Sequence, residues 1–276
     1  MRVRRPAVAG QFYPAHPTQL VAAVHRMLAE AEAARIGDAA PARGAIAPHA
    51  GYVYSGRTAA CVFARLDVPR RVVVVGPNHT GDGRSLQGGS ACALGVWQTP
   101  AGDVPVDEAL AARLLAECPI VEDDPEAHRR EHSIEVMLPF LLARRPDVVV
   151  TPIVLGWADW PHTRTLGEAL ATLVRTSEEP VLLLASSDMN HFEPAAVGKQ
   201  KDDLALAEVQ KLDGERLLEV TRRHRISMCG RAPAAAVLHA AKLLGGERAE
   251  VVDYSHSGMV TGDEGAVVGY AGVIAR

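Results

Sequence analysis

The segment Arg71–Gly81, RVVVVGPNHTG, holds four consecutive valines followed at once by a glycine, a proline and, two residues later, a histidine. A continuous apolar run of this kind is typical of a strand that is buried on both faces, as strands inside parallel sheets are. Gly76 and Pro77 end the strand, so we expect His79 just beyond its carboxyl end. In open α/β sheets ligands bind at that edge. The segment therefore predicts an α/β fold and a candidate site residue.

Two further segments repeat this arrangement. GAIAPHAGY is a short apolar strand followed by a proline and His49, and PVLLLASSDMNHF is a longer apolar strand that leads into Asp188 and His191. The carboxyl ends of neighbouring parallel strands meet at one edge of a sheet. We therefore expect these side chains to lie beside His79 and to form one site with it.

Apolar strands and amphipathic helices alternate along most of the chain, which predicts a mixed or mostly parallel sheet with helices on both faces. Further strands are expected at 91–97 and 148–156 and in two segments near the C-terminus. Helices are expected at 18–35, 55–66, 108–117, 161–174, 202–212, 214–223 and 233–244. Ser55 and Asp107 are predicted to cap two of them. Since the sequence shows no repeat and no change of composition, we expect one domain spanning residues 1–276.

Composition and charge exclude several classes of function. Hydrophobic residues make up 48% of the 276 residues, which is ordinary for a globular protein with a sizeable core. A net charge of −4 gives no electrostatic signature of nucleic-acid binding. No stretch approaches the ~18 apolar residues of a membrane span. The four cysteines are scattered without CxxC spacing and the N-terminal segment lacks a secretion signal, so we predict reduced thiols and a cytoplasmic location.

Residues 123–145, DDPEAHRREHSIEVMLPFLLARR, are predicted to form one long helix that begins at Pro125 and is kinked at Pro139. Two pairs of polar side chains, each four residues apart, would then share a helix face: His128 with His132, and Glu131 with Glu135. These side chains could hold a metal or form salt bridges with the neighbouring arginines. We place His132 and Glu135 behind the metal ligands, with a direct ligand role open for His132.

The candidate site combines strand-end residues with one thiol and one phenol: His49, His79, Asp188, His191, Cys229 and, as a substrate contact, Tyr54. Two histidines and one anionic group form a metal-ligand set that leaves room for a substrate. Imidazole suits iron, copper and zinc, and a thiolate favours the softer ions. Because Cys229 lies just before a predicted helix, we expect the partial positive charge of the helix N-terminus to lower the thiol pKa.

Five segments resemble the signature segments of the Memo family, which in bacteria and archaea is also named as protein B of the AmmeMemoRadiSam system. They run in the family's order over nearly the whole chain: PHAGYVYSG, GPNHTG, EHSIEVMLPFL, SSDMNHFEP and SMCGRAP. AVAGQFYP near the start fits as well. The resemblance implies the fold of the class III extradiol ring-cleaving (LigB-like) dioxygenases, which use non-haem iron.

The resemblance implies a role for each residue of the site. His49, His79 and Cys229 correspond to the family's metal ligands, while Asp188 and His191 correspond to the residues beside the metal, with His191 as acid/base and Asp188 orienting it. Iron as Fe²⁺ is the expected metal, with copper as the alternative and zinc as a substitute. The dioxygenases carry a carboxylate where this chain has Cys229, and a thiolate alters the iron potential or favours copper. An oxidoreductase of unknown substrate is the function implied.

Two other functions stay open. The pocket could be a degenerate enzyme site that binds a peptide or a partner protein, and the family's prokaryotic name implies a radical-SAM enzyme and an AMMECR-type protein as such partners. Alternatively, Cys229 could be the nucleophile of a metal-free hydrolase or transferase, with His49 or His191 as its base.

Overall fold

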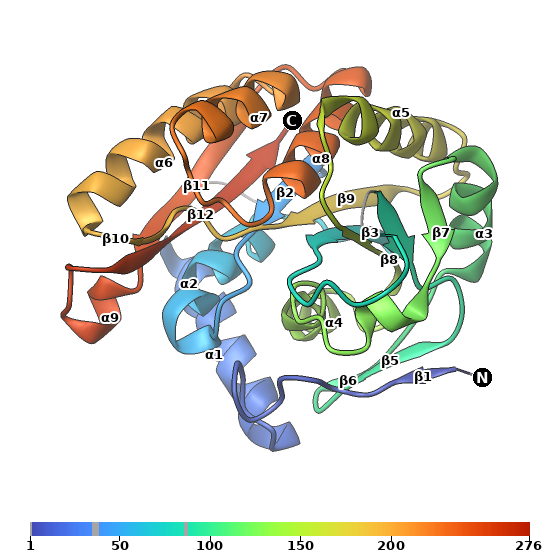
Figure 1. Ribbon diagram of the computed structural model, residues 1–276. Helices are drawn as coiled ribbons and strands as arrows, with labels where there is room; N and C mark the ends of the chain where they lie inside the picture. The colour runs from blue at the N-terminus through green and yellow to red at the C-terminus, as the bar shows by residue number, and fades with distance from the viewer. Residues whose placement is uncertain (1, 35–38, 86–87) are drawn as a thin grey trace.

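A computed structural model describes residues 2–34, 39–85 and 88–276 of the chain (Figure 1). Its centre is a nine-stranded sheet with the strand order β10-β12-β2-β9-β3-β8-β4-β7, in which β11 pairs with β12. The four middle strands are parallel to one another: β2 (Gly44–Ala47), β9 (Val181–Ser186), β3 (Arg71–Pro77) and β8 (Val149–Leu155). The valine-rich segment is thus a central strand, as its composition predicts.

Antiparallel pairs at both edges make the sheet mixed. On one side β12 (Val267–Ala275) pairs antiparallel with β2, β11 (Ala249–His256) and β10 (His191–Glu193). On the other side β4 (Gly89–Ala91) pairs antiparallel with β8 and parallel with β7 (Val121–Asp123). A separate three-stranded sheet contains β1 (Val3–Arg4), β5 (Val96–Thr99) and β6 (Gly102–Pro105).

The prediction of one strand over 91–97 is wrong, because the two ends of this segment belong to different sheets. Residue 91 ends β4, whereas β5 starts at Val96. Gly95 lies between them with φ of +110°, a conformation in which a side chain would be strained. A Cβ atom on Gly95 would also lie 2.1 Å from the carbonyl oxygen of Arg2. The glycine therefore turns the chain out of the large sheet.

Helices cover both faces of the sheet, as predicted (Figure 1). One face carries α3 (Glu108–Glu117), α5 (Trp160–Arg175), α6 (Ala195–Gln210), α7 (Gly214–Arg223) and α8 (Arg231–Leu243). The other carries α1 (Pro17–Ala34), α2 (Tyr52–Phe63) and α4 (Leu138–Arg144). Alternate valines of β3 enter the two cores, with Val73 and Val75 facing the first group and Val72 and Val74 the second. This alternation follows from the period of two in a strand. A short helix, α9 (Gly258–Thr261), precedes β12.

Most helix limits lie close to the predicted ones, but α6 begins at Ala195 and not at the predicted residue 202. Helices α3 and α7 have the predicted bounds, and the Asp107 side chain caps α3 by accepting a hydrogen bond from the N–H of Leu110. Helix α2 begins at Tyr52, so Ser55 lies inside it and does not cap it; its hydroxyl donates to the carbonyl of Ala50. Helix α1 is described as far as Ala34, and the predicted last residue, 35, lies outside the described residues.

The prediction of a single long helix over 123–145 is wrong. Residues 125–128 and 135–137 form two 3₁₀ turns, η1 (Pro125–His128) and η2 (Glu135–Met137), and only α4 is α-helical. Between the turns, the Glu131 carboxylate accepts the N–H groups of His132 and Ser133, which competes with helical hydrogen bonding. Pro139 lies in the first turn of α4, where it is compatible with the helix, and does not kink it. His128 and His132 therefore do not share a helix face, and neither do Glu131 and Glu135.

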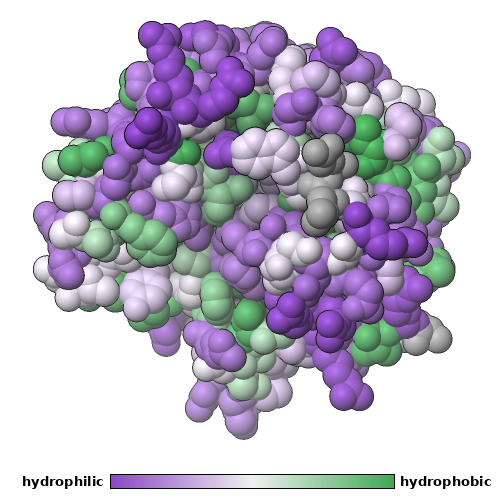
Figure 2. All heavy atoms as spheres, viewed as in Figure 1, coloured by the Kyte–Doolittle hydropathy of each residue, from purple (hydrophilic) through white to green (hydrophobic). Residues whose placement is uncertain are grey.

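The face of the molecule seen in Figure 2 is mostly hydrophilic, and its apolar residues lie in small scattered groups. Among the described residues, no helix combines the length and the apolar character that crossing a membrane requires.

Candidate metal centre

The site lies where the parallel strands β2, β9 and β3 end side by side. His49 follows β2, Asp188 follows β9 and His79 follows β3. The convergence expected from three strands with a common direction is therefore present. Cys229 approaches from the short loop that joins α7 to α8.

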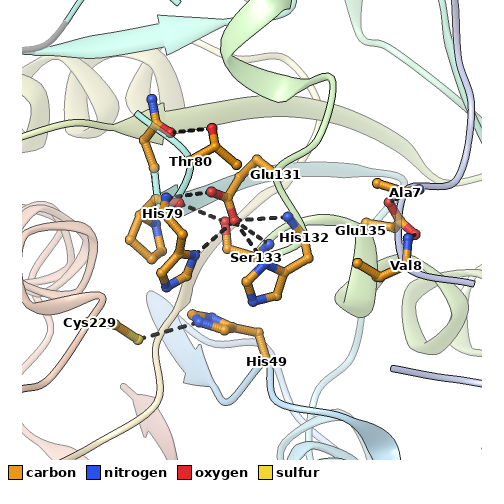
Figure 3. Close-up of polar contacts among 12 residues, drawn as sticks. Ala7, Val8, His49, His79, Thr80, Glu131, His132, Ser133, Glu135 and Cys229 are labelled. Atoms are coloured by element: carbon orange, nitrogen blue, oxygen red, sulfur yellow. Dashed lines mark hydrogen bonds and ion pairs between the residues drawn. The ribbon is translucent and has the colours of Figure 1, made fainter. Parts of the chain in front are cut away.

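One ligand set consists of His49, His79 and Cys229, whose candidate ligand atoms all lie within 4.8 Å of one another. The Cys229 sulfur is 3.4 Å from Nε2 of His49. Figure 3 shows the sulfur directed toward the His49 ring, with the rings of His79 and His132 on the same side of that ring. Two imidazoles and one thiol at this separation could hold a metal ion.

The His49 ring is buried, and a hydroxyl fixes its orientation. Its Nδ1 atom lies 2.7 Å from the Ser186 hydroxyl, which itself donates to the carbonyl oxygen of Ser133. Because that hydroxyl proton is already used, Ser186 accepts from Nδ1–H of His49, which leaves Nε2 with a free lone pair. Burial, together with the charges of His79 and His132, holds the pKa of His49 well below its usual value. The ring is therefore neutral, as a ligand must be.

Glu131 fixes the His79 ring in the same manner. Nδ1 of His79 lies 2.9 Å from Oε1 of Glu131, and the backbone N–H of His79 also donates to this carboxylate. Burial alone would raise the pKa of Glu131, but the hydrogen bond and charge of His79 and the charge of His132 outweigh it and hold the pKa well below its usual range. An ionised Glu131 keeps the proton on Nδ1 of His79 and leaves Nε2 free for a ligand role.

Glu131, and not Glu135 as predicted, hydrogen-bonds a histidine of the ligand set. Glu135 instead lies under the N-terminal segment, where its two oxygens accept the N–H groups of Ala7 and Val8 at 2.8 and 3.1 Å. The side chains of Arg4 and Tyr13 contact the same carboxylate. Glu135 therefore attaches residues 4–13 to the fold. A helix over 123–145 does not predict the contact of Glu131 with His79, because only an irregular turn lets the Glu131 carboxylate reach back to that histidine.

His132 lies against both histidines of the ligand set, as its predicted place behind them requires. Its ring stacks on that of His79, with centroids 4.7 Å apart and planes inclined by 19°, and lies 5.4 Å from that of His49. His79, Glu131 and His132 also form a second group of ligand atoms within 4.8 Å of one another. Burial lowers the pKa of His132, which favours the neutral ring.

Asp188 supports the loop of His49. Its Oδ1 atom accepts the N–H groups of His49 and Ala50 at 2.8 and 3.3 Å, and its own N–H donates to the Cys229 sulfur at 3.2 Å. Burial raises the pKa of Asp188 to about 6, against these hydrogen bonds. The hydrogen bonds of the carboxylate go to the loop of His49, and the role expected for it, orienting His191, stays a prediction. The side chains of Asp188, His191 and Cys229 form one group, in which the candidate ligand atoms lie within 4.8 Å of one another.

His191 is held through its backbone. Its N–H donates to the hydroxyl of Ser227 at 2.8 Å, while its ring Nδ1 is buried and has no hydrogen-bond partner within the described part of the chain. Burial lowers the pKa of His191, so the ring is neutral at physiological pH. A neutral ring with an unused nitrogen can accept a proton.

The predicted activation of Cys229 by a helix N-terminus is wrong for the protein without metal. Burial, followed by the charge of Asp188, raises the pKa of the Cys229 thiol. The loss of hydration destabilises a thiolate at this position more than the partial positive charge at the start of α8 stabilises it. Without a bound cation, Cys229 is therefore a protonated thiol.

A cavity of about 480 Å³ lies over the cluster, a size suited to a small organic molecule. His49, His79, His132, Asp188 and His191 line it, together with the aromatic residues Phe12, Tyr54, Phe192 and Tyr270. Tyr54, the expected substrate contact, stands in its wall and is half-exposed.

The chain matches the family described as Memo-like protein over residues 4–274. The chain belongs to the Memo family. MEMO1 family proteins of Methanosarcina barkeri and Aquifex aeolicus are 42% and 39% identical to it over 273 and 276 residues, and each match covers 99% of both chains. The resemblance carried by the five segments is thus confirmed.

A solved structure shows the same fold at low sequence identity. The crystal structure of an uncharacterized protein from Escherichia coli K12 superposes with a TM-score of 0.50 and 17% identity, covering 77% of this chain and 89% of that one. At that identity the likeness concerns the fold alone.

Proposed function

We propose that this Memo family protein binds a redox-active metal ion at His49, His79 and Cys229 and acts as an oxidoreductase on a small organic molecule. The carrying observation is the arrangement of two imidazoles and one sulfur within 4.8 Å beside a cavity. Fe²⁺ is the proposed metal, with copper as the alternative and zinc as a substitute, because imidazole and thiolate ligands suit these ions.

The donor set fits such an ion. Ser186 and Glu131 each hold an imidazole by Nδ1, so that Nε2 of both rings carries the lone pair that a ligand needs. Cys229 would lose its proton on binding, and the N–H of Asp188 is placed to stabilise the resulting anion. When bound, the metal would supply redox and Lewis-acid chemistry, which the chain's own side chains lack.

The residues around the centre would handle the proton and the substrate. His191, which is neutral and lines the cavity, would accept a proton from a molecule held there. Tyr54 and Phe12 would contact the apolar part of that molecule. Asp188 would keep His49 in place through the backbone of its loop.

Metal analysis of the purified protein tests the proposal. We expect close to one iron or copper ion per chain in the wild type and at least a tenfold loss in His49→Ala and Cys229→Ala. His162→Ala is the matched control, since His162 lies in the exposed first turn of α5 and hydrogen-bonds Asp159. Equal metal content in all four proteins would refute the metal site.

The metal-free cysteine enzyme is the weaker alternative. Such a mechanism needs a thiolate, and burial together with Asp188 keeps Cys229 protonated. Iodoacetamide should therefore alkylate Cys229 slowly in protein stripped of metal. Rapid alkylation with parallel loss of a hydrolytic activity would favour this alternative instead.

Partner binding is the second candidate function, and one exposed aromatic residue favours it. Phe192 is 76% exposed at the cavity and has φ of +61°, an unusual conformation for a bulky residue. We propose that a peptide of a partner protein contacts Phe192. The proposed partners are radical-SAM and AMMECR-type proteins, and the proposed location of the interaction is the cytoplasm. Pull-down of these proteins should weaken in Phe192→Ala and not in Val197→Ala, an exposed residue on α6.

A further inference from the structure

A second cavity reaches the metal centre from the side of α8. It has a volume of about 390 Å³, and its lining includes His79 and Cys229 of the metal centre together with Trp157 and Arg231. It adjoins a cavity of about 580 Å³, with which it shares Trp157, Ala158, Ser227 and Arg231. Neither cavity is the one that contains Tyr54.

Arg231 dominates the charge of the second cavity. Among the described residues that line it there is no aspartate or glutamate, and Arg231 is the only arginine or lysine. The guanidinium carbon lies 5.4 Å from the centroid of the Trp157 ring. Among the described residues, Arg231 forms no ion pair with a carboxylate. A guanidinium in this setting retains the fork of donors that matches a carboxylate.

The backbone adds to this charge. Arg231 is the first residue of α8, which has 13 residues, and the free N–H groups of its first turn carry partial positive charge. The cavity therefore combines a side-chain cation with a helix N-terminus. Both favour the binding of an anion.

Three acidic residues line the adjoining cavity, and two of them are already paired. Asp159 caps α5 and hydrogen-bonds His162, while Glu219 pairs with Arg216. Glu215 lines that cavity as well, together with Arg222 and Arg225. None of these three acidic residues lines the second cavity itself.

We propose that this second cavity recognises a carboxylate on a planar apolar molecule. The carboxylate would bind Arg231, and the apolar body would lie against Trp157 and Leu155 with its far end toward His79 and Cys229. The inference rests on the proposed function, since it gives the substrate of the metal centre a carboxylate. Arg231 would then determine which substrates are accepted.

Titration of metal-free protein with benzoate, followed by calorimetry, tests the proposal. We expect saturable binding to the wild type, at least tenfold weaker binding to Arg231→Gln, and an intermediate loss in Arg231→Lys, which keeps the charge and loses the fork. Arg26→Gln, which changes an exposed arginine on α1, should bind like the wild type. Benzoate should also slow alkylation of Cys229, because the thiol lines the same cavity.

Several results would overturn the proposal. These are unchanged affinity in both Arg231 variants, an equal loss in Arg26→Gln, benzamide binding as tightly as benzoate, or inorganic phosphate binding more tightly than benzoate. The measurement uses protein without metal, so its outcome does not depend on the metal site. Metal content, measured separately, should be the same in Arg231→Gln and the wild type.

Discussion

The Cys229 sulfur lies 3.4 Å from Nε2 of His49, although the two residues are 180 positions apart in the chain. Strand β9 lies between their elements: it pairs with β2, and the hydroxyl of Ser187 just after it accepts the N–H of Gly230. The order of strands in the sheet, and not local sequence, thus brings the thiol and the imidazole together.

We predict that Gly230→Ala weakens both the fold and the metal centre. A Cβ atom on Gly230 would lie 2.3 Å from the carbonyl oxygen of Ser186 and 2.5 Å from Cβ of Ser187, so the loop carrying Cys229 must shift. Overpacking of this kind costs roughly 1–3 kcal/mol. Urea unfolding and metal content measure the two effects.

Gly198→Ala is the control for that variant. Gly198 lies in α6, and an added Cβ atom would make only ordinary contacts, the nearest at 3.8 Å. Alanine in a helix interior should raise stability by about 0.5–1 kcal/mol. If Gly230→Ala were as stable as Gly198→Ala and kept its metal, the tight approach at Gly230 would be unimportant.

We predict that Glu131→Gln lowers metal affinity by about 10–100-fold, the usual effect of losing a carboxylate that orients a ligand histidine. The variant keeps the shape of the side chain but loses the charge that holds the proton on Nδ1 of His79. Chelator competition measures the affinity. Glu126→Gln, an exposed residue paired with Arg129, is the control, and an equal loss in both variants would contradict the role of Glu131.

We predict that Asp202 makes stability fall as pH rises from about 4 to 7. Its buried carboxylate accepts the N–H of Asn190 and the hydroxyl of Tyr254, and burial raises its pKa to about 6. The folded protein therefore holds this proton at pH values where the unfolded chain, with its ordinary aspartate pKa, has lost it. The associated stability is complete below about pH 4 and is lost as pH rises through the folded pKa of about 6.

Thermal unfolding at pH 5 and pH 7 measures this effect. Asp202→Asn should show a smaller loss between the two values, by on the order of 1 kcal/mol. Asp188, whose pKa is also raised to about 6, adds a similar loss that both proteins share. Asp103→Asn, which changes an exposed carboxylate in β6, should behave like the wild type. A pH dependence in Asp202→Asn as steep as in the wild type would contradict the prediction.

The sequence predicts the sheet and the place of the site well, because both follow from short patterns. Four valines before Gly76 identify a strand buried on both faces, and parallel strands must present their ends at one edge. His49, His79 and Asp188 could therefore be grouped without coordinates. Asp107 as a helix cap follows from an equally local rule.

Contacts that depend on the third dimension could not be predicted in this way. The role of Glu131 requires an irregular turn where the spacing of apolar residues favours a helix, and the pairing of Glu135 with the N-terminal segment spans more than 120 residues. Likewise, the position of Cys229 before α8 indicates a lowered thiol pKa, whereas its burial raises the pKa. Burial is a property of the packed protein and not of the local sequence.

Anomalous scattering from a crystal grown without chelator tests the central claim most directly. Data collected on both sides of the iron and copper absorption edges should show one peak between Nε2 of His49, His79 and the Cys229 sulfur, at about 2.0–2.4 Å from each. The peak should vanish in crystals of Cys229→Ala. A peak placed elsewhere, or density at this point that shows neither edge, would contradict a redox-active metal held by these residues.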